Sequence, residues 1–260
     1  MQNGFLEYNK GKIFYQIDGD GEPIVFIHGF SLDHRMWTKQ VEYFSKYYQV
    51  ITYDMRGFGK SSIPASEYSH HEDLNALLKF LKIKKAHIIG LSLGGEVAID
   101  FTLEYLSEVE SLTLLSSSLG GYTKKTYAVK VDWDIRARKK GMHEGKRNWL
   151  NHEIFRNIVN NSKTHKDLVD MVKYYSGWHW LNNDLREKLG PPAIDRLKEI
   201  TVPTMICVGE NDIKYFKTIL GILNKSITES KKVLISGSGH MVNMEEPIKV
   251  NKLIEKHITR

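Results

Sequence analysis

Ser92 stands in a stretch whose spacing is typical of an activated nucleophile. The segment 90–95, Gly-Leu-Ser-Leu-Gly-Gly, follows an apolar strand-like run at 86–89 and opens a helix-like run at 96–103. A serine on so tight a strand-to-helix turn adopts strained backbone angles. Side chains two positions before or after it would clash, and glycine avoids those clashes. The same segment also fits a helix capped by serine after a glycine turn, so the partners of Ser92 must decide.

A serine hydroxyl needs a positioned base, and a carboxylate must hold that base. Of the 11 histidines, His240 fits best, because it follows the apolar run 233–235 through a Gly- and Ser-rich loop that can carry an imidazole over the serine. A histidine in such a loop could also be an exposed turn residue. The acid should end a strand between the serine and the histidine. Asp212, shortly after the apolar run 204–208, is our first choice and Glu210 is the second.

Strand-like and helix-like segments alternate over most of the chain. Apolar strand-like runs occur at 7–8, 13–17, 23–27, 49–53, 86–90, 112–115, 204–208 and 233–235, and helical patterns at 36–47, 67–81, 96–107, 215–223 and 247–257. This alternation predicts an α/β fold with a mostly parallel eight-stranded sheet and helices on both faces. Ligands of open parallel sheets bind beyond the carboxyl ends of the strands. His28, Ser92 and Asp212 all fall at or just past predicted strand ends.

The alternation stops between residues 119 and 190. Short helical patterns rich in aromatic residues replace it, and about 70 residues are too many for an ordinary connection. We therefore expect a helical cap inserted after the sixth strand, with 119–190 as the cap and 1–118 and 191–260 as the core. Its tryptophans can pack the cap helices together and can also roof a cleft over the serine, where they would bind substrate, and we expect both. They are Trp133, Trp149, Trp178 and Trp180.

The net charge of +6 is concentrated in the predicted cap. Residues 119–190 hold 15 Lys and Arg against 8 Asp and Glu, whereas the remainder holds 22 against 23. The simplest interpretation is solvated helix faces. The sharper hypothesis is that a basic cap attracts an acidic substrate or an acidic carrier protein. No nucleic-acid recognition motif accompanies the charge, so we expect no nucleic-acid partner.

Other chemically capable residues have structural explanations. His70 and His71 are adjacent and do not converge on one ion, so we expect the start of a solvated helix and no metal site. His87 should pack within or beside its strand. Arg56 should pair with nearby carboxylate or carbonyl groups and hold a Gly-rich turn. The single cysteine, Cys207, lies in an apolar run, which predicts a buried, inert thiol and excludes a disulfide framework.

The N-terminus carries no signal-peptide pattern, and no apolar stretch approaches the roughly 20 residues that span a bilayer. We therefore expect a soluble cytoplasmic protein without a membrane partner, either a monomer or a homodimer.

Four motifs stand in a fixed order along the chain: His-Gly-Phe at 28–30, Asp-x-Arg-Gly-x-Gly-x-Ser at 54–61, the glycine–serine segment at 90–95, and Gly-His at 239–240. In these motifs the chain resembles α/β-hydrolases, over essentially its whole length. By this resemblance the oxyanion hole is formed by the backbone N–H groups of Phe30 and Leu93, the side chain of Phe30 is a cleft wall that binds substrate, and His28 stabilises its loop.

The order Ser92, Asp212, His240 is the one found in α/β-hydrolases, and it implies a serine hydrolase that cleaves a carboxylic ester through an acyl-enzyme without metal or organic cofactor. Related epoxide hydrolases and haloalkane dehalogenases use aspartate at the nucleophile position, which argues against both. C–C bond hydrolases and enol-lactonases remain open, and so do esterases of carrier-bound acyl esters. Non-haem haloperoxidase-type activity could accompany any of them. A different class is a ligand-binding receptor or scaffold with this fold, which turnover would distinguish.

Overall fold

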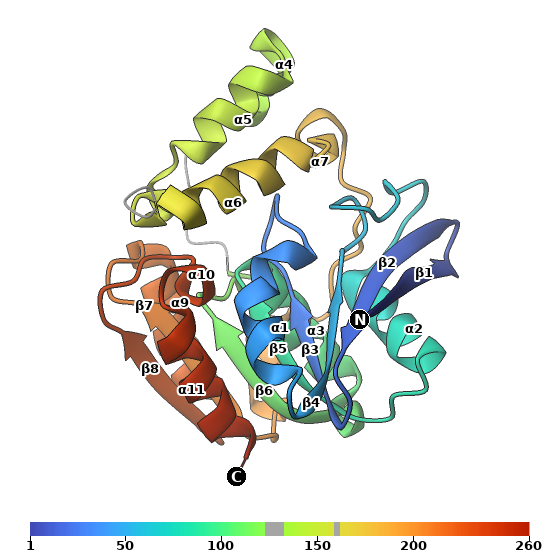
Figure 1. The fold of residues 1–260 in the computed structure, drawn as a ribbon, viewed down its shortest axis with the longest axis vertical. Coiled ribbons are helices and arrows are strands. Elements are labelled where there is room, and N and C mark those ends of the chain that lie inside the picture. Colours follow the sequence, from blue (N-terminus) through green and yellow to red (C-terminus); the bar gives the residue numbers. More distant parts are fainter. Residues whose placement is uncertain (123–132, 159–161, 260) are drawn as a thin grey trace.

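One eight-stranded sheet forms the centre of the molecule. The computed structural model describes residues 1–122, 133–158 and 162–259, and its strands follow the order β1-β2-β4-β3-β5-β6-β7-β8 (Figure 1). Strands β1 and β2 form an antiparallel hairpin, β2 pairs antiparallel with β4, and the remaining neighbours are parallel. The predicted mostly parallel sheet is therefore confirmed. The strands are β1 Gln2–Tyr8, β2 Gly11–Asp18, β3 Glu22–Ile27, β4 Tyr48–Tyr53, β5 Ala86–Leu91, β6 Val109–Leu115, β7 Thr204–Gly209 and β8 Ser230–Ile235.

Helices cover both faces of this sheet. Helix α1 contacts α11, and helix α2 contacts α3. The described α-helices are α1 Thr38–Phe44, α2 His70–Phe80, α3 Leu93–Glu104, α4 Trp133–Lys140, α5 Met142–Leu150, α6 Ser162–Tyr174, α7 Trp178–Leu181, α8 Ala193–Arg196, α9 Lys214–Ser226, α10 Val242–Glu245 and α11 Pro247–Ile258. Among the described helices none is both long and apolar enough to cross a bilayer.

The first predicted helix, 36–47, is divided in two. A 3₁₀ turn, His34–Trp37, precedes α1, because the Asp33 side chain accepts the N–H of Arg35 and starts the turn early. The second predicted helix, 67–81, begins only at His70.

The central strands are buried on both faces, as their continuous apolar runs predict. Each residue from Ile24 to Ile27 is 0% exposed, and the ring of Phe26 packs against Trp37 and Phe44. Strand β8 lies at one edge of the sheet and is different: Lys231, Lys232 and Leu234 are exposed.

The long connection between β6 and β7 carries helices α4 to α7, which confirms a helical insertion after the sixth strand (Figure 1). It lies over the carboxyl ends of the strands, since Trp149 of α5 donates a hydrogen bond from Nε1 to Oγ of Ser31, just beyond β3, at 2.6 Å. The boundaries at 119 and 190 stay predictions.

Candidate active site

The backbone at Ser92 is strained where β5 turns into α3. Its φ is 56° and its ψ is −115°, a region that costs a non-glycine residue on the order of 1–3 kcal/mol. A Cβ at position 90 would lie 2.1 Å from the carbonyl oxygen of Gly94, and one at position 94 would lie 2.1 Å from that of Ile27. The predicted need for glycine two positions before and after the serine is therefore confirmed.

The loop after β3 lies beside this turn. A Cβ at Gly29 would come 3.6 Å from Cβ of Ser92. Neither Phe30 nor Leu93 donates its backbone N–H to another residue that the structure describes. Both N–H groups thus lack a hydrogen-bond partner among the described residues, as the predicted oxyanion hole requires.

His28 holds that loop in place. Its Nε2 accepts the backbone N–H of Met55 at 2.9 Å, so the ring proton is on Nδ1, which donates to the carbonyl of Gly29 at 2.8 Å. Complete burial lowers the pKa of the imidazole and keeps it neutral. This is the stabilising contact that the sequence predicts for His28.

His240 and Asp212 form a buried pair. Nδ1 of His240 lies 3.1 Å from Oδ2 of Asp212, and the two side chains are 2% and 0% exposed. Oδ1 of Asp212 accepts the N–H of Ile213, and the imidazole packs on the ring of Phe216 at 4.1 Å between centroids. The second choice for the acid, Glu210, instead accepts hydrogen bonds from Ser236 and Gly237.

The serine and the imidazole are not joined in this structure. Although both are described, no hydrogen bond links Oγ of Ser92 to His240, and Ser92 is partly exposed. Both residues lie at the carboxyl ends of the strands. Strands β5, β6, β7 and β8 are successive parallel neighbours, and Ser92 follows β5 while His240 follows β8. The catalytic hydrogen bond of such a pair often tightens only when substrate is bound.

An aromatic cluster joins the loop after β3 to the insertion, and Phe30 is at its centre. Its ring contacts the rings of Trp149 and Trp180 of the insertion, at 5.9 and 6.4 Å between centroids. The ring of Trp178 contacts that of His179. Trp178 and Phe30 are both described, and their rings are not in contact. The side chain of Trp133 lies outside the described residues.

Three further residues of this cluster were not predicted. Phe58 stacks on Tyr175 and His179 at 5.3 and 4.5 Å, and all three pack against Phe30. Tyr175 lies just past the end of α6 and His179 lies on α7, so no single helical pattern joins them and only their ring side chains were available as a signal. Burial lowers the pKa of His179 to about 4, so its ring stays neutral within the cluster.

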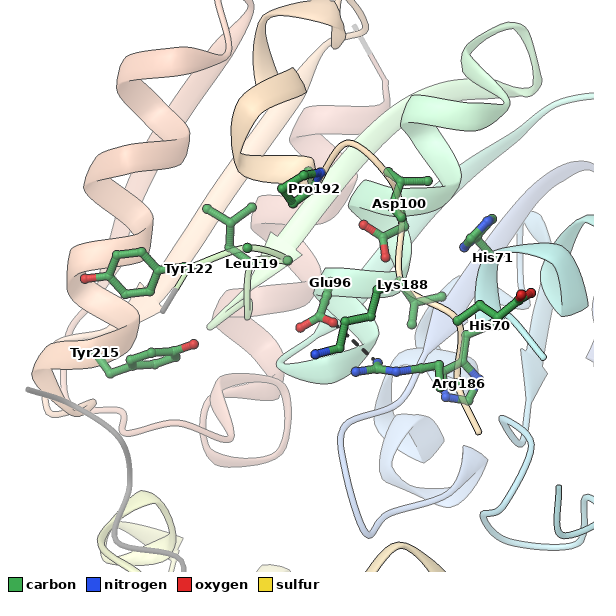
Figure 2. A pocket seen from close by; sticks show the side chains of 16 residues that line it. His70, His71, Glu96, Asp100, Leu119, Tyr122, Arg186, Lys188, Pro192 and Tyr215 are labelled. Carbon is green, nitrogen blue, oxygen red and sulfur yellow. Dashed lines mark ion pairs between the residues drawn. The ribbon is translucent and has the colours of Figure 1, made fainter. Parts of the chain in front are cut away.

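A cavity of about 320 Å³, lined by both charged and apolar side chains, lies beside α3, one helical turn beyond Ser92 (Figure 2). Figure 2 shows Tyr122 and Tyr215 at one end and His70 and His71 at the other. Asp100 and the ion pair between Arg186 and Glu96 (3.4 Å) lie between these ends. Burial, and then the neighbouring charge of Glu96, raises the pKa of Asp100 to about 7. The insertion thus brings charged groups close to the helix that follows the serine.

The histidines at the start of α2 are the one wrong prediction among the residues given structural roles. His70 and His71 are 4% and 8% exposed rather than solvated. The ring of His70 packs against Tyr68 and Phe58, and burial, followed by the charge of Arg186, lowers its pKa. Tertiary packing against the 54–68 loop, invisible in a helical pattern, buries this turn.

The remaining structural predictions are confirmed. Arg56 is buried and binds both carboxylate oxygens of Asp73, at 2.7 and 3.0 Å, as well as the carbonyls of Tyr8 and Asn9. His87 is buried with its Nδ1 2.7 Å from Oγ of Ser111.

Cys207 is also buried as predicted, and burial raises the pKa of its thiol to about 12.

Asp33, His34 and Asp54 form the one group of described residues with enough clustered donor atoms to hold a metal ion; their ligand atoms lie within 4.8 Å of one another. Those atoms already have partners. Asp33 binds the guanidinium of Arg35 through both oxygens, and Asp54 accepts the backbone N–H of Lys60. We therefore assign this cluster a structural role.

Comparison with known proteins agrees with this geometry. A family model described as the alpha/beta hydrolase fold matches residues 22–247. The chain is 28% identical to the AB hydrolase superfamily protein YisY of Bacillus subtilis (strain 168), and the match covers 93% of both. It is also 28% identical to 3-oxoadipate enol-lactonase 1 of Acinetobacter baylyi (strain ATCC 33305 / BD413 / ADP1), over 90% of this chain and 88% of that protein.

Among solved structures, Est816, described as an N-acyl homoserine lactone degrading enzyme, superposes with a TM-score of 0.79 at 25% identity. That match covers 97% of this chain and 99% of Est816.

Proposed function

Because this chain belongs to the α/β-hydrolase family, we propose that it is a serine hydrolase that cleaves a carboxylic ester through an acyl-enzyme. The observation that carries the proposal is the strained backbone of Ser92, at φ 56° on a turn whose flanking glycines cannot be replaced without collision. Strain of this kind persists where the surrounding structure enforces it, and it concentrates at functional sites.

In the proposed mechanism, His240 removes the proton of the Ser92 hydroxyl as the oxygen attacks the carbonyl carbon. The N–H groups of Phe30 and Leu93 donate to the developing oxyanion, a contribution of roughly 3–4 kcal/mol per donor in other serine hydrolases. His240 then protonates the leaving alcohol, and a water molecule repeats the cycle on the acyl-enzyme. Asp212 fixes the tautomer of the imidazole and stabilises its charged form throughout.

Replacement of the nucleophile tests this proposal. Ser92→Ala should lower kcat/KM for p-nitrophenyl acetate by about 10⁴-fold or more, because no acyl-enzyme can form. Ser116→Ala is the matched control, since Ser116 is also a serine at positive φ, 43°, at the end of the neighbouring strand β6. A Ser92→Ala protein that melts like the wild type and still hydrolyses the ester at a comparable rate would refute the assignment.

The bond cleaved is tested by a substrate panel. Two of the proteins compared above are named for lactone cleavage, and a lactone is a cyclic ester, so open-chain esters and lactones belong in the same panel. A vinylogous 1,5-diketone tests the alternative of C–C bond hydrolysis. A single burst of product without sustained turnover would instead favour the ligand-binding receptor.

The exposed cations of the insertion support an acidic substrate or carrier as a refinement. Arg138, Lys139 and Lys140 are all exposed at the end of α4. Turnover of an acidic ester should then fall as salt is added, whereas that of a small neutral ester should not.

A further inference from the structure

Glu245, the last residue of α10, holds the loop of His240 from both sides. Its Oε2 accepts the backbone N–H of Gly239 at 2.6 Å, and its Oε1 accepts that of Met241 at 3.1 Å. One carboxylate therefore accepts the backbone N–H groups of the residues immediately before and after the histidine. Hydrogen bonds from backbone N–H groups to a carboxylate are among the stronger ones in proteins.

This anchoring matters because the rest of the loop is intrinsically loose. Gly237 and Gly239 flank a serine before the histidine, and Gly237 adopts φ 80°, so the segment has unusually large backbone freedom to lose. The imidazole itself has one hydrogen-bond partner among the described residues, Asp212. The position of the ring consequently depends on how its backbone is held.

Asn157, from the insertion between β6 and β7, completes the arrangement. Its Nδ2 donates to Oε2 of Glu245 at 3.1 Å and to the carbonyl of Gly237 at 2.9 Å. The contact is close, since a Cβ at Gly239 would come 2.8 Å from Cβ of Asn157. A single amide of the insertion thus binds both the anchoring carboxylate and the loop that it anchors.

We propose that Glu245 and Asn157 are positioning residues for His240, and that through them the helical insertion sets the placement of the imidazole against Asp212. This inference rests on the proposed role of His240 as the base. Displacing the insertion removes the Asn157 bonds, frees the loop and weakens the contact between imidazole and carboxylate. The insertion then acts on the chemical step as well as on substrate binding.

Glu245→Gln is the primary test. The glutamine side chain has one oxygen where the carboxylate has two. Its NH₂ group is a donor and would face another donor, a backbone N–H or the amide of Asn157, so one hydrogen bond to the loop is lost. We expect kcat to fall about tenfold with KM little changed, because misplacement of a catalytic group by less than 1 Å has effects of this size. The imidazolium loses stabilisation, so the acid limb of the kcat/KM profile should move to lower pH.

A neighbouring carboxylate provides the control, and a double variant tests whether Glu245 and Asn157 act together. Glu246→Gln alters the neighbouring carboxylate, which pairs outward with Lys249 at 3.2 Å, and should stay within twofold of the wild type. Asn157→Ala should give a smaller loss with a shift in the same direction. The double variant should be no worse than Glu245→Gln alone, because both changes release one anchor.

An unchanged acid limb in Glu245→Gln, or fully additive effects of the two changes, would overturn the proposal. If Glu245→Gln does not fold, the pH profile of Asn157→Ala decides. The downfield proton resonance of His240 Nδ1–H provides a readout without turnover: it should weaken or shift in Asn157→Ala and stay in place in Glu246→Gln. If Ser92→Ala remains active, the proposed function fails, whereas this resonance still tests the positioning.

Discussion

Two histidines of the described chain lie against buried aspartates, and we propose a catalytic role for only one of these two pairs. Nδ1 of His34 lies 2.8 Å from Asp54, and Nδ1 of His240 lies 3.1 Å from Asp212. All four residues follow strands of the same sheet, and both carboxylates are buried. Residue types and distances alone would rank the two pairs as equals.

The surroundings of the two carboxylates differ. Asp54 accepts two backbone N–H groups, from His34 at 2.7 Å and Lys60 at 2.8 Å, in addition to the imidazole. Hydrogen bonds to both of its oxygens make Asp54 the centre of a rigid turn. Asp212 accepts one backbone N–H and otherwise serves the imidazole, which lies at the edge that carries Ser92. The comparison teaches that the other hydrogen bonds of the carboxylate, rather than the imidazole–carboxylate contact itself, indicate the role of each pair.

Breaking the pair of His240 and Asp212 should have the largest effect, and that effect should be on kcat. Asp212→Asn should lower kcat by about 10³–10⁴-fold while the melting temperature changes little, because the amide favours the wrong tautomer of His240. Esterase kinetics and a thermal melt measure the two quantities. Glu210→Gln is the matched control, a carboxylate two residues away that bonds Ser236, and it should remain active. The assignment of the acid is wrong if these two outcomes are exchanged.

Breaking the pair of His34 and Asp54 should destabilise the fold and leave kcat nearly unchanged. Burial alone would raise the pKa of Asp54, but hydrogen bonding and charge from His34 outweigh it, so the pKa lies below its ordinary value of 3.8. Asp54 therefore stabilises the fold above the unfolded-state pKa and ceases to do so as the pH falls through the folded-state pKa.

At pH 7, Asp54→Asn should reduce the free energy of unfolding by about 3 kcal/mol in a urea titration, since two partly buried N–H donors lose the buried, charged carboxylate that accepts them. The kcat of the folded variant should stay within a fewfold of the wild type. A loss of kcat as large as that of Asp212→Asn would erase the distinction between the two pairs.

Asp100 extends the comparison to a carboxyl group without hydrogen-bonded partners, and its replacement should have the smallest effect. Oδ1 of Asp100 is buried and has no hydrogen-bond partner among the described residues, and its pKa is raised to about 7. A raised carboxyl pKa lowers stability as the pH rises from 3.8 towards 7, the opposite sign to Asp54.

Asp100→Asn should accordingly stabilise the protein at pH 8 by roughly 2 kcal/mol, and near pH 4 the difference should vanish. Urea titrations at the two pH values measure it. Equal stability changes at both would show that the carboxyl does not titrate in this range.

Local patterns predicted the parts of the site that depend on neighbouring residues in sequence. The turn at Ser92 follows from two glycines, and Asp212 follows from the end of an apolar strand, so both could be placed without a structure. Strands β1 and β8 begin earlier than expected. Gln2 and Asn3 of β1 and Lys231 and Lys232 of β8 are exposed and polar, so these starts give no apolar run.

What escaped prediction depends on contacts between distant segments. Glu245 and Asn157 are 88 residues apart, and nothing in either sequence neighbourhood indicates that they meet. His70 looked like a solvated residue because its burial comes from Tyr68 and Phe58, which approach from outside its helix. The ion pair of Arg56 could be expected in kind, but its partner Asp73 lies on α2 and is found only when the chain has folded.

The open edge of β8 has a consequence for how copies of this chain meet. An unpaired edge offers its peptide groups to any strand that can lie alongside, which is a common route to aggregation. Here Lys231 and Lys232 project from that edge strand. A second copy paired edge to edge would place ammonium groups close together, so like-charge repulsion disfavours extension of the sheet from one copy to the next.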